Sequence, residues 1–134
     1  MPTILLDTDV VSFLIKGDTR ATTYGPLVQG NTLAVSFMTV AELFQWAAVR
    51  HWGPRRLNHL EQALAAYLVV PVDIEMCRIW GTLRAERQSA GETISPQDAW
   101  IAATALRHNL PLVTHNATDY QGVATLDVRT AAQP

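Results

Sequence analysis

The stretch Thr3-Ile4-Leu5-Leu6-Asp7 decides the fold, because it is a short apolar run that ends in a carboxylate. Such runs are typical of strands that a parallel sheet buries on both faces. Similar runs recur at residues 33–36, 68–70 and 112–114, and residues 124–128 are expected to add a short edge strand. The sequence therefore predicts a central parallel sheet.

The segments between these runs have the apolar spacing and the boundary residues of helices. We expect helices at residues 10–15, 38–51, 55–67, 74–89 and 96–109, with a less clearly patterned segment at 19–28. Gly17 is expected to end the first helix, and Gly53-Pro54 to separate the helix at 38–51 from the helix at 55–67. Strands that alternate with helices are typical of βαβ units, so the predicted fold class is α/β.

Length and composition indicate one globular domain over residues 1–134. Hydrophobic residues make up 49% of the chain and charged residues 16%, which excludes a disordered chain. No apolar run approaches the roughly 20 residues of a membrane span. The N-terminus lacks the basic region of a signal peptide, so we expect neither membrane insertion nor export.

The single cysteine, Cys77, cannot form an internal disulfide, which fits a reducing cytoplasm. It lies in the apolar stretch 74–80, so we expect a buried structural thiol. No Cys–His spacing supports a zinc site. The net charge of −2 is less basic than is common for nucleic-acid binders.

Four acids follow the expected strands or begin the expected helices: Asp7, Glu42, Asp98 and Asp119. In open α/β sheets, ligands bind outside the carboxyl ends of the strands, so these carboxylates are expected to meet at one edge. Gathered carboxylates repel one another, and a divalent cation relieves that repulsion. The sequence therefore predicts a Mg²⁺ or Mn²⁺ site.

The alternative is that these acids only cap helices. Thr39, Ser95 and Asn116 each precede one of them by three positions, which approaches a capping box. Asp7 follows a strand, where no capping role is evident, and the joint placement of all four acids favours the cation site. Asp9 is either a fifth ligand or an N-cap of the first helix, and the cap is the favoured interpretation.

Four stretches of the chain, residues 5–12, 39–43, 98–105 and 114–120, resemble the motifs of PIN-domain ribonucleases. The likeness is greatest to the VapC-type toxins of toxin–antitoxin operons, and it extends from Thr3 to about Val128. It implies a PIN-like three-layer α/β/α sandwich with a central parallel sheet of four to five strands.

The resemblance also implies an activity: Mg²⁺- or Mn²⁺-dependent endonucleolytic cleavage of RNA that leaves 5′-phosphate and 3′-hydroxyl ends. Its implied catalytic residues are Asp7, Glu42, Asp98 and Asp119, of which Asp7, Asp98 and Asp119 are the metal ligands. Either Glu42 or Asp119 is expected to position the attacking water. The implied partners are a cognate antitoxin and a second copy of the chain, and Asp9 stands where these toxins usually have asparagine.

Small polar and basic residues complete the expected site. Thr8, Asp9, Thr114 and Asn116 are expected to orient the carboxylates or metal-bound water. The substrate-binding candidates are Arg50, Arg55 and Arg56, because guanidinium groups bind phosphates and the intervening Trp52 can stack on a base. The alternative for this basic segment is a solvated corner between two helices.

Two other functions remain open. Asp7-Thr8-Asp9 matches the first motif of haloacid-dehalogenase-like phosphatases, but the only lysine, Lys16, lies too early and no adjacent acidic pair occurs later. A PIN-like module that binds RNA or protein without cleavage is the second alternative.

Overall fold

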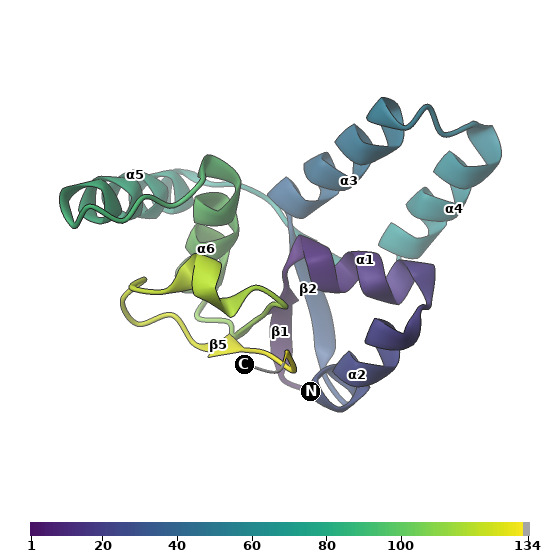
Figure 1. Ribbon diagram of the computed structural model, residues 1–134, viewed down its shortest axis with the longest axis horizontal. Helices are drawn as coiled ribbons and strands as arrows, with labels where there is room; N and C mark the ends of the chain where they lie inside the picture. Colours follow the sequence, from purple (N-terminus) through teal and green to yellow (C-terminus); the bar gives the residue numbers. More distant parts are fainter. Residues whose placement is uncertain (133–134) are drawn as a thin grey trace.

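The computed structural model describes residues 1–132 and contains a five-stranded parallel sheet with the strand order β3-β2-β1-β4-β5 (Figure 1). The strands are β1 (Thr3–Leu6), β2 (Thr32–Ser36), β3 (Leu68–Val70), β4 (Leu112–Val113) and β5 (Val128–Arg129). The predicted α/β class and the parallel sheet are confirmed.

Helices cover both faces of the sheet, with α5 and α6 on one side and α1 and α2 on the other (Figure 1). Their bounds are α1 (Thr8–Lys16), α2 (Thr19–Val28), α3 (Phe37–Val49), α4 (Pro54–Leu64), α5 (Ile74–Ser89) and α6 (Pro96–His108), followed by the 3₁₀ helix η1 (Ala117–Tyr120). The segment 19–28, which had the weakest sequence pattern, is helix α2. This arrangement is the expected three-layer sandwich.

Alternate residues of the strands supply two separate cores. Leu5 and Ala34 pack with α5 and α6, whereas Leu6, Val35 and Val113 pack with α1 to α4. Because successive side chains of a strand point to opposite faces, a strand buried on both faces needs a continuous apolar run. This requirement explains why the short runs in the sequence predicted the strands.

The site region lies where the chain changes direction across the sheet. After β1 the chain forms β2 and β3 on one side, and it later crosses to form β4 and β5 on the other. The amide of Asp7 donates to the carbonyl of Val113 at 2.9 Å, which ties the carboxyl ends of β1 and β4 together. Such switch points are the usual ligand sites of open α/β sheets.

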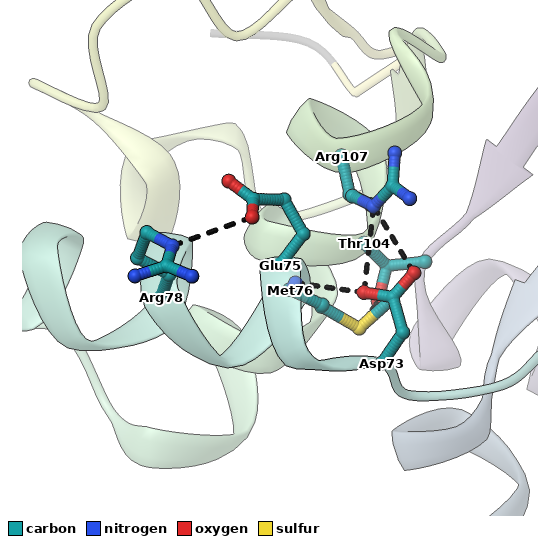
Figure 2. Close-up of polar contacts among 6 residues, drawn as sticks. All are labelled: Asp73, Glu75, Met76, Arg78, Thr104 and Arg107. Atoms are coloured by element: carbon teal, nitrogen blue, oxygen red, sulfur yellow. Dashed lines mark hydrogen bonds and ion pairs between the residues drawn. The ribbon is translucent and has the colours of Figure 1, made fainter.

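Helix α6, which carries Asp98, is fixed against α5 by polar contacts at the start of α5 (Figure 2). Asp73 caps α5 by accepting from the amide of Met76 at 2.8 Å, and it also accepts from Nε of Arg107 on α6 at 3.1 Å. The Thr104 hydroxyl on α6 lies 3.5 Å from Sδ of Met76. These contacts hold the two helices in register.

Two expectations about the second half of the chain were wrong. The edge strand is limited to Val128–Arg129, because Thr125 adopts a φ of 66° and the amide of Leu126 turns back to the carbonyl of Val123. Cys77 is exposed, because α5 buries Met76 rather than its neighbour.

No helix within residues 1–132 is both long and apolar enough to cross a membrane.

Candidate functional site

Asp7 is a buried carboxylate that caps α1. It follows β1 directly, its side chain is 6% exposed, and its Oδ1 accepts from the amide of Thr8 at 2.8 Å. Its Oδ2 accepts from the hydroxyls of Thr114 at 2.8 Å and Tyr120 at 2.9 Å. The expectation that Asp7 has no capping role was wrong, because α1 begins at Thr8 rather than at Val10.

The surroundings of Asp7 favour its neutral form when no cation is bound. Burial raises the pKa of the Asp7 carboxyl to about 7, the Asp9 carboxylate adds to the rise, and the hydrogen bonds from Thr114, Thr8 and Tyr120 oppose it. Burial, together with the charges of Asp7 and Asp98, also raises the pKa of Tyr120, so its hydroxyl remains a donor. A carboxylate held in this way gains from a nearby positive charge.

Glu42 lies on α3 and is joined to the start of α1. The Thr8 hydroxyl donates to its Oε1 at 2.8 Å, and the Thr39 hydroxyl lies 2.9 Å from the Thr8 hydroxyl. Because the single hydroxyl hydrogen of Thr8 goes to Glu42, Thr39 is the donor to Thr8. Burial raises the pKa of Glu42, and the charges of Asp98 and Asp9 raise it further. Thr39 is not the helix cap that we expected.

The N-cap of α3 is Ser36, which accepts from the amide of Met38 at 3.1 Å. Helix α3 therefore begins at Phe37, two residues before the predicted capping residue Thr39. This shift places Thr39 inside the first turn of α3, where its hydroxyl is buried and donates to Thr8 instead.

Asp98 lies in the first turn of α6, beside Asp119. Ser95 caps the helix by accepting from the amide of Asp98 at 3.1 Å, as expected. Burial raises the pKa of Asp98, and the neighbouring charge of Asp119 also raises it. Asp119 is exposed on η1, and Asn116 makes no side-chain cap there. The predicted capping box at Asn116 is therefore wrong.

Asp9 holds the loop that follows β4 instead of capping α1. Its Oδ2 accepts from the side-chain amide of Asn116 at 2.9 Å and from the backbone amide of His115 at 3.2 Å. Burial raises the pKa of Asp9. The favoured interpretation of Asp9 as the N-cap was wrong because Asp7 has that position.

The acids around Asp7 lack cationic partners. Within residues 1–132, the ion pairs with arginine use other carboxylates: Asp18, Asp73, Glu75, Glu92 and Asp127. The site is therefore a set of oxygen donors with uncompensated negative charge, which is the donor chemistry that Mg²⁺ and Mn²⁺ prefer. The residue types present fit such a cation.

The carboxylates are neighbours, but they do not form a closed cage. Within the described chain, no three His, Cys, Asp or Glu side chains lie close enough together to hold an ion as they stand. Asp7 and Asp98 are instead linked through the Tyr120 hydroxyl, which lies 2.9 Å from Asp7 and 3.3 Å from Asp98. Side-chain rotation would be needed to bring these oxygens onto one ion.

A groove between α1, α3 and α4 connects this region to the basic segment. Asp9, Arg50 and Arg56 line the same cavity, which has a volume of about 380 Å³. Arg55 and Arg56 line an adjoining cavity. The Arg56 guanidinium lies 4.3 Å from the ring centroid of Trp52, so one face of that indole is already covered. The basic segment is thus brought to the groove, and the proposed stacking face of Trp52 is only partly available.

Tyr120 and Thr39 are the polar side chains of the site that the sequence interpretation missed. Tyr120 is 2% exposed and contacts two of the four acids, and Thr39 completes the hydroxyl chain to Glu42. A tyrosine directly after Asp119 is visible in the sequence. The direction of the Tyr120 side chain depends on the tight turn of η1, which the sequence did not predict.

Comparisons with known proteins agree with this architecture. The PIN domain family model matches residues 4–125. The chain is 32% identical to VapC ribonuclease Y4jK of Sinorhizobium fredii over 98% of this chain and 99% of the relative. It is 26% identical to the tRNA(fMet)-specific endonuclease VapC of Shigella flexneri over 91% and 92% of the two chains.

Solved structures of VapBC complexes have the same fold as this chain. The VapBC-1 structure from nontypeable Haemophilus influenzae matches with a TM-score of 0.84 at 26% identity, covering 96% of this chain and 98% of that one. The DNA-bound VapBC structure from Salmonella typhimurium matches with a TM-score of 0.83 at 25% identity, covering 98% and 100%. By its sequence and its fold, this chain belongs to the PIN-domain family, within its group of VapC ribonucleases.

Proposed function

We propose that this chain hydrolyses RNA phosphodiester bonds at a Mg²⁺ or Mn²⁺ ion held by Asp7, Asp98 and Asp119. The endoribonuclease activity and the role as a toxin follow from membership of the VapC family, whose nucleases depend on metals as a class. The observation that supports the site is the buried Asp7 carboxylate without a cationic partner, linked to Asp98 through one hydroxyl.

The residues of the chain have distinct roles in this proposal. Asp7 and Asp98 bind the cation from the end of β1 and the start of α6, and Asp119 adds a carboxylate from η1. When bound, a divalent cation supplies charge that polarises the phosphoryl oxygen and acidifies water. Glu42 and Asp119 are the two candidates for accepting the proton of the attacking water. Thr8 and Thr114 orient Glu42 and Asp7 through the hydrogen bonds described above.

The metal requirement is tested by RNA cleavage in Mg²⁺, in Mn²⁺ and with EDTA in excess. We expect cleavage with either ion, complete loss with EDTA, and recovery when Mn²⁺ is added back. Fragments should carry 5′-phosphate ends that a 5′-phosphate-dependent exonuclease degrades. Cleavage that persists in EDTA would contradict the proposal, and RNA binding without cleavage in any metal would support the non-catalytic alternative. Family membership excludes the phosphatase alternative.

We infer that RNA reaches the acids along the groove lined by Arg50 and Arg56. The Arg50→Gln/Arg56→Gln double variant should bind RNA more weakly, and the salt dependence of log K should fall by about 0.7 per lost phosphate contact. Binding is measured by fluorescence anisotropy at several salt concentrations, in an Asp98→Asn background that prevents cleavage. Arg78→Gln is the matched control, because Arg78 is exposed on α5 and pairs with Glu75. Equal losses of RNA affinity in the double variant and in Arg78→Gln would contradict the assignment of Arg50 and Arg56 to RNA binding.

Partners and location complete the proposal. Solved relatives are VapBC complexes, and we infer a protein antitoxin for this chain. A homodimer is supported by exposed apolar side chains, among them Val49 at 69% and Ile74 at 76%. We further propose a cytoplasmic location, because a single cysteine that cannot form an internal disulfide fits a reducing compartment. Residues 1–134 are inferred to form one domain.

A further inference from the structure

The Tyr120 hydroxyl lies between two carboxylates of the site. It is 2.9 Å from Oδ2 of Asp7 and 3.3 Å from Oδ1 of Asp98, and the residue is 2% exposed. Asp7 follows β1 and Asp98 begins α6, so the contact joins two elements that are far apart in the sequence. No other hydroxyl within residues 1–132 touches both acids.

The charges of these acids make such a contact useful. Two ionised carboxylates with no cation between them repel each other, and each responds by favouring its neutral form, so neither group fixes the direction of the other. A hydroxyl proton placed between them attracts both. Because a phenol has one hydrogen, it donates to one carboxylate at a time, and the shorter distance indicates that Asp7 is the main acceptor.

The hydroxyl leaves oxygen atoms available for a cation. A carboxylate accepts about four hydrogen bonds, and Asp7 accepts three from the described residues. The remaining capacity is on Oδ1 of Asp7, the oxygen that Tyr120 does not contact. On Asp98, the contact with Tyr120 involves Oδ1 and not Oδ2. The tyrosine can therefore keep both groups as neighbours while leaving an acceptor position on each, and the side chains must still rotate to bring those oxygens onto one ion.

We propose that Tyr120 is a positioning residue whose hydroxyl holds the Asp7 and Asp98 carboxylates side by side before a divalent cation binds. This inference rests on the proposed metal-dependent function. Outer hydrogen bonds that orient ligands typically change metal affinity by about 10- to 100-fold when they are removed. The hydroxyl lowers the free energy needed to bring the two carboxylates together. Its loss therefore weakens metal affinity more than it slows RNA cleavage at saturating metal.

The test measures Mn²⁺ binding by isothermal titration calorimetry in the wild-type chain and in Tyr120→Phe. The variant removes one oxygen atom and keeps the ring that fills the core. We expect its dissociation constant for Mn²⁺ to rise about 10- to 100-fold, with RNA cleavage at saturating Mn²⁺ within a few fold of wild type. Circular dichroism and urea unfolding should be measured to check that the variant is folded.

Two comparison variants separate positioning from general destabilisation. Tyr67→Phe removes a hydroxyl in the turn between α4 and β3, away from the acids, and should leave Mn²⁺ affinity unchanged. Thr114→Val removes the other hydroxyl on the same oxygen of Asp7 but keeps the link to Asp98, so it should weaken Mn²⁺ binding less than Tyr120→Phe does.

Three results would overturn the inference. Unchanged or tighter Mn²⁺ binding by Tyr120→Phe would show that the hydroxyl does not assemble the site. An equal loss in Thr114→Val would show that the link to Asp98 has no special effect. Absence of Mn²⁺ binding by the wild-type chain would instead refute the proposed function, and the inference with it.

Discussion

Replacing Asp7 with asparagine is expected to reduce RNA cleavage about 1,000-fold, because the lost metal ligand removes several kcal/mol of charge stabilisation from the transition state. The fold should survive this change. Asparagine caps helices as well as aspartate does, so α1 keeps its start. The Thr114 and Tyr120 hydroxyls can accept as well as donate, so an amide nitrogen at Oδ2 finds partners.

The matched control for this prediction is Asp73→Asn. Asp73 also caps a helix, α5, and it pairs with Arg107, which lies in the last turn of α6 at the opposite end from Asp98 (Figure 2). Initial cleavage rates are measured in saturating Mg²⁺ with all three chains at equal concentration. Asp73→Asn should cleave RNA at nearly the wild-type rate. Comparable activity in Asp7→Asn and wild type would remove Asp7 from the catalytic site.

The second large expected effect is on stability in the absence of metal. Burial raises the pKa of Asp7 from its ordinary value of 3.8, which applies to the unfolded chain, to about 7 in the folded chain, so the folded state binds this proton more tightly than the unfolded state. Between these values the free energy of unfolding must therefore fall as pH rises. The full contribution of the Asp7 proton to the free energy of unfolding is present below about pH 3.8. It is lost above about pH 7, which is a change of roughly 4 kcal/mol.

Asp7→Asn isolates this contribution because asparagine does not titrate. In EDTA, urea unfolding at a series of pH values should show wild type losing stability relative to the variant as pH rises. Added Mn²⁺ should reverse that loss at high pH, since a bound ion stabilises the folded state. The Asp73→Asn comparison should not show this trend, because the pKa of Asp73 is lowered by its hydrogen bond from Met76 and by Arg107. A constant difference between wild type and Asp7→Asn would contradict the prediction.

The sequence predicted the sheet and most helices because their signals are local. The run that ends at Asp7 is buried on both faces, so burial leaves a continuous apolar pattern. Gly17 ends α1 in the left-handed conformation with a φ of 67°, as its position in the sequence indicated. These features depend on neighbouring residues alone.

The errors arose where distant segments decide the outcome. Asp9 contacts Asn116, which is 107 positions away, so its neighbours in the sequence could not reveal its role. Cys77 lies in an apolar stretch, but the packing of α5 selects Met76 for burial and leaves Ile74 76% exposed. Tyr120 reaches Asp7 only because η1 turns tightly after β4. Tertiary packing determined each of these positions.

The most direct test of the central claim is the anomalous scattering of Mn²⁺ in crystals of the wild-type chain. We expect one strong peak between the Asp7 and Asp98 carboxylates, with oxygen distances of about 2.1 Å, and a rotation of these side chains from the positions described above. The same crystals of Asp7→Asn should lose the peak. A Mn²⁺ peak elsewhere in the wild-type chain, with none at Asp7 and Asp98, would contradict the account.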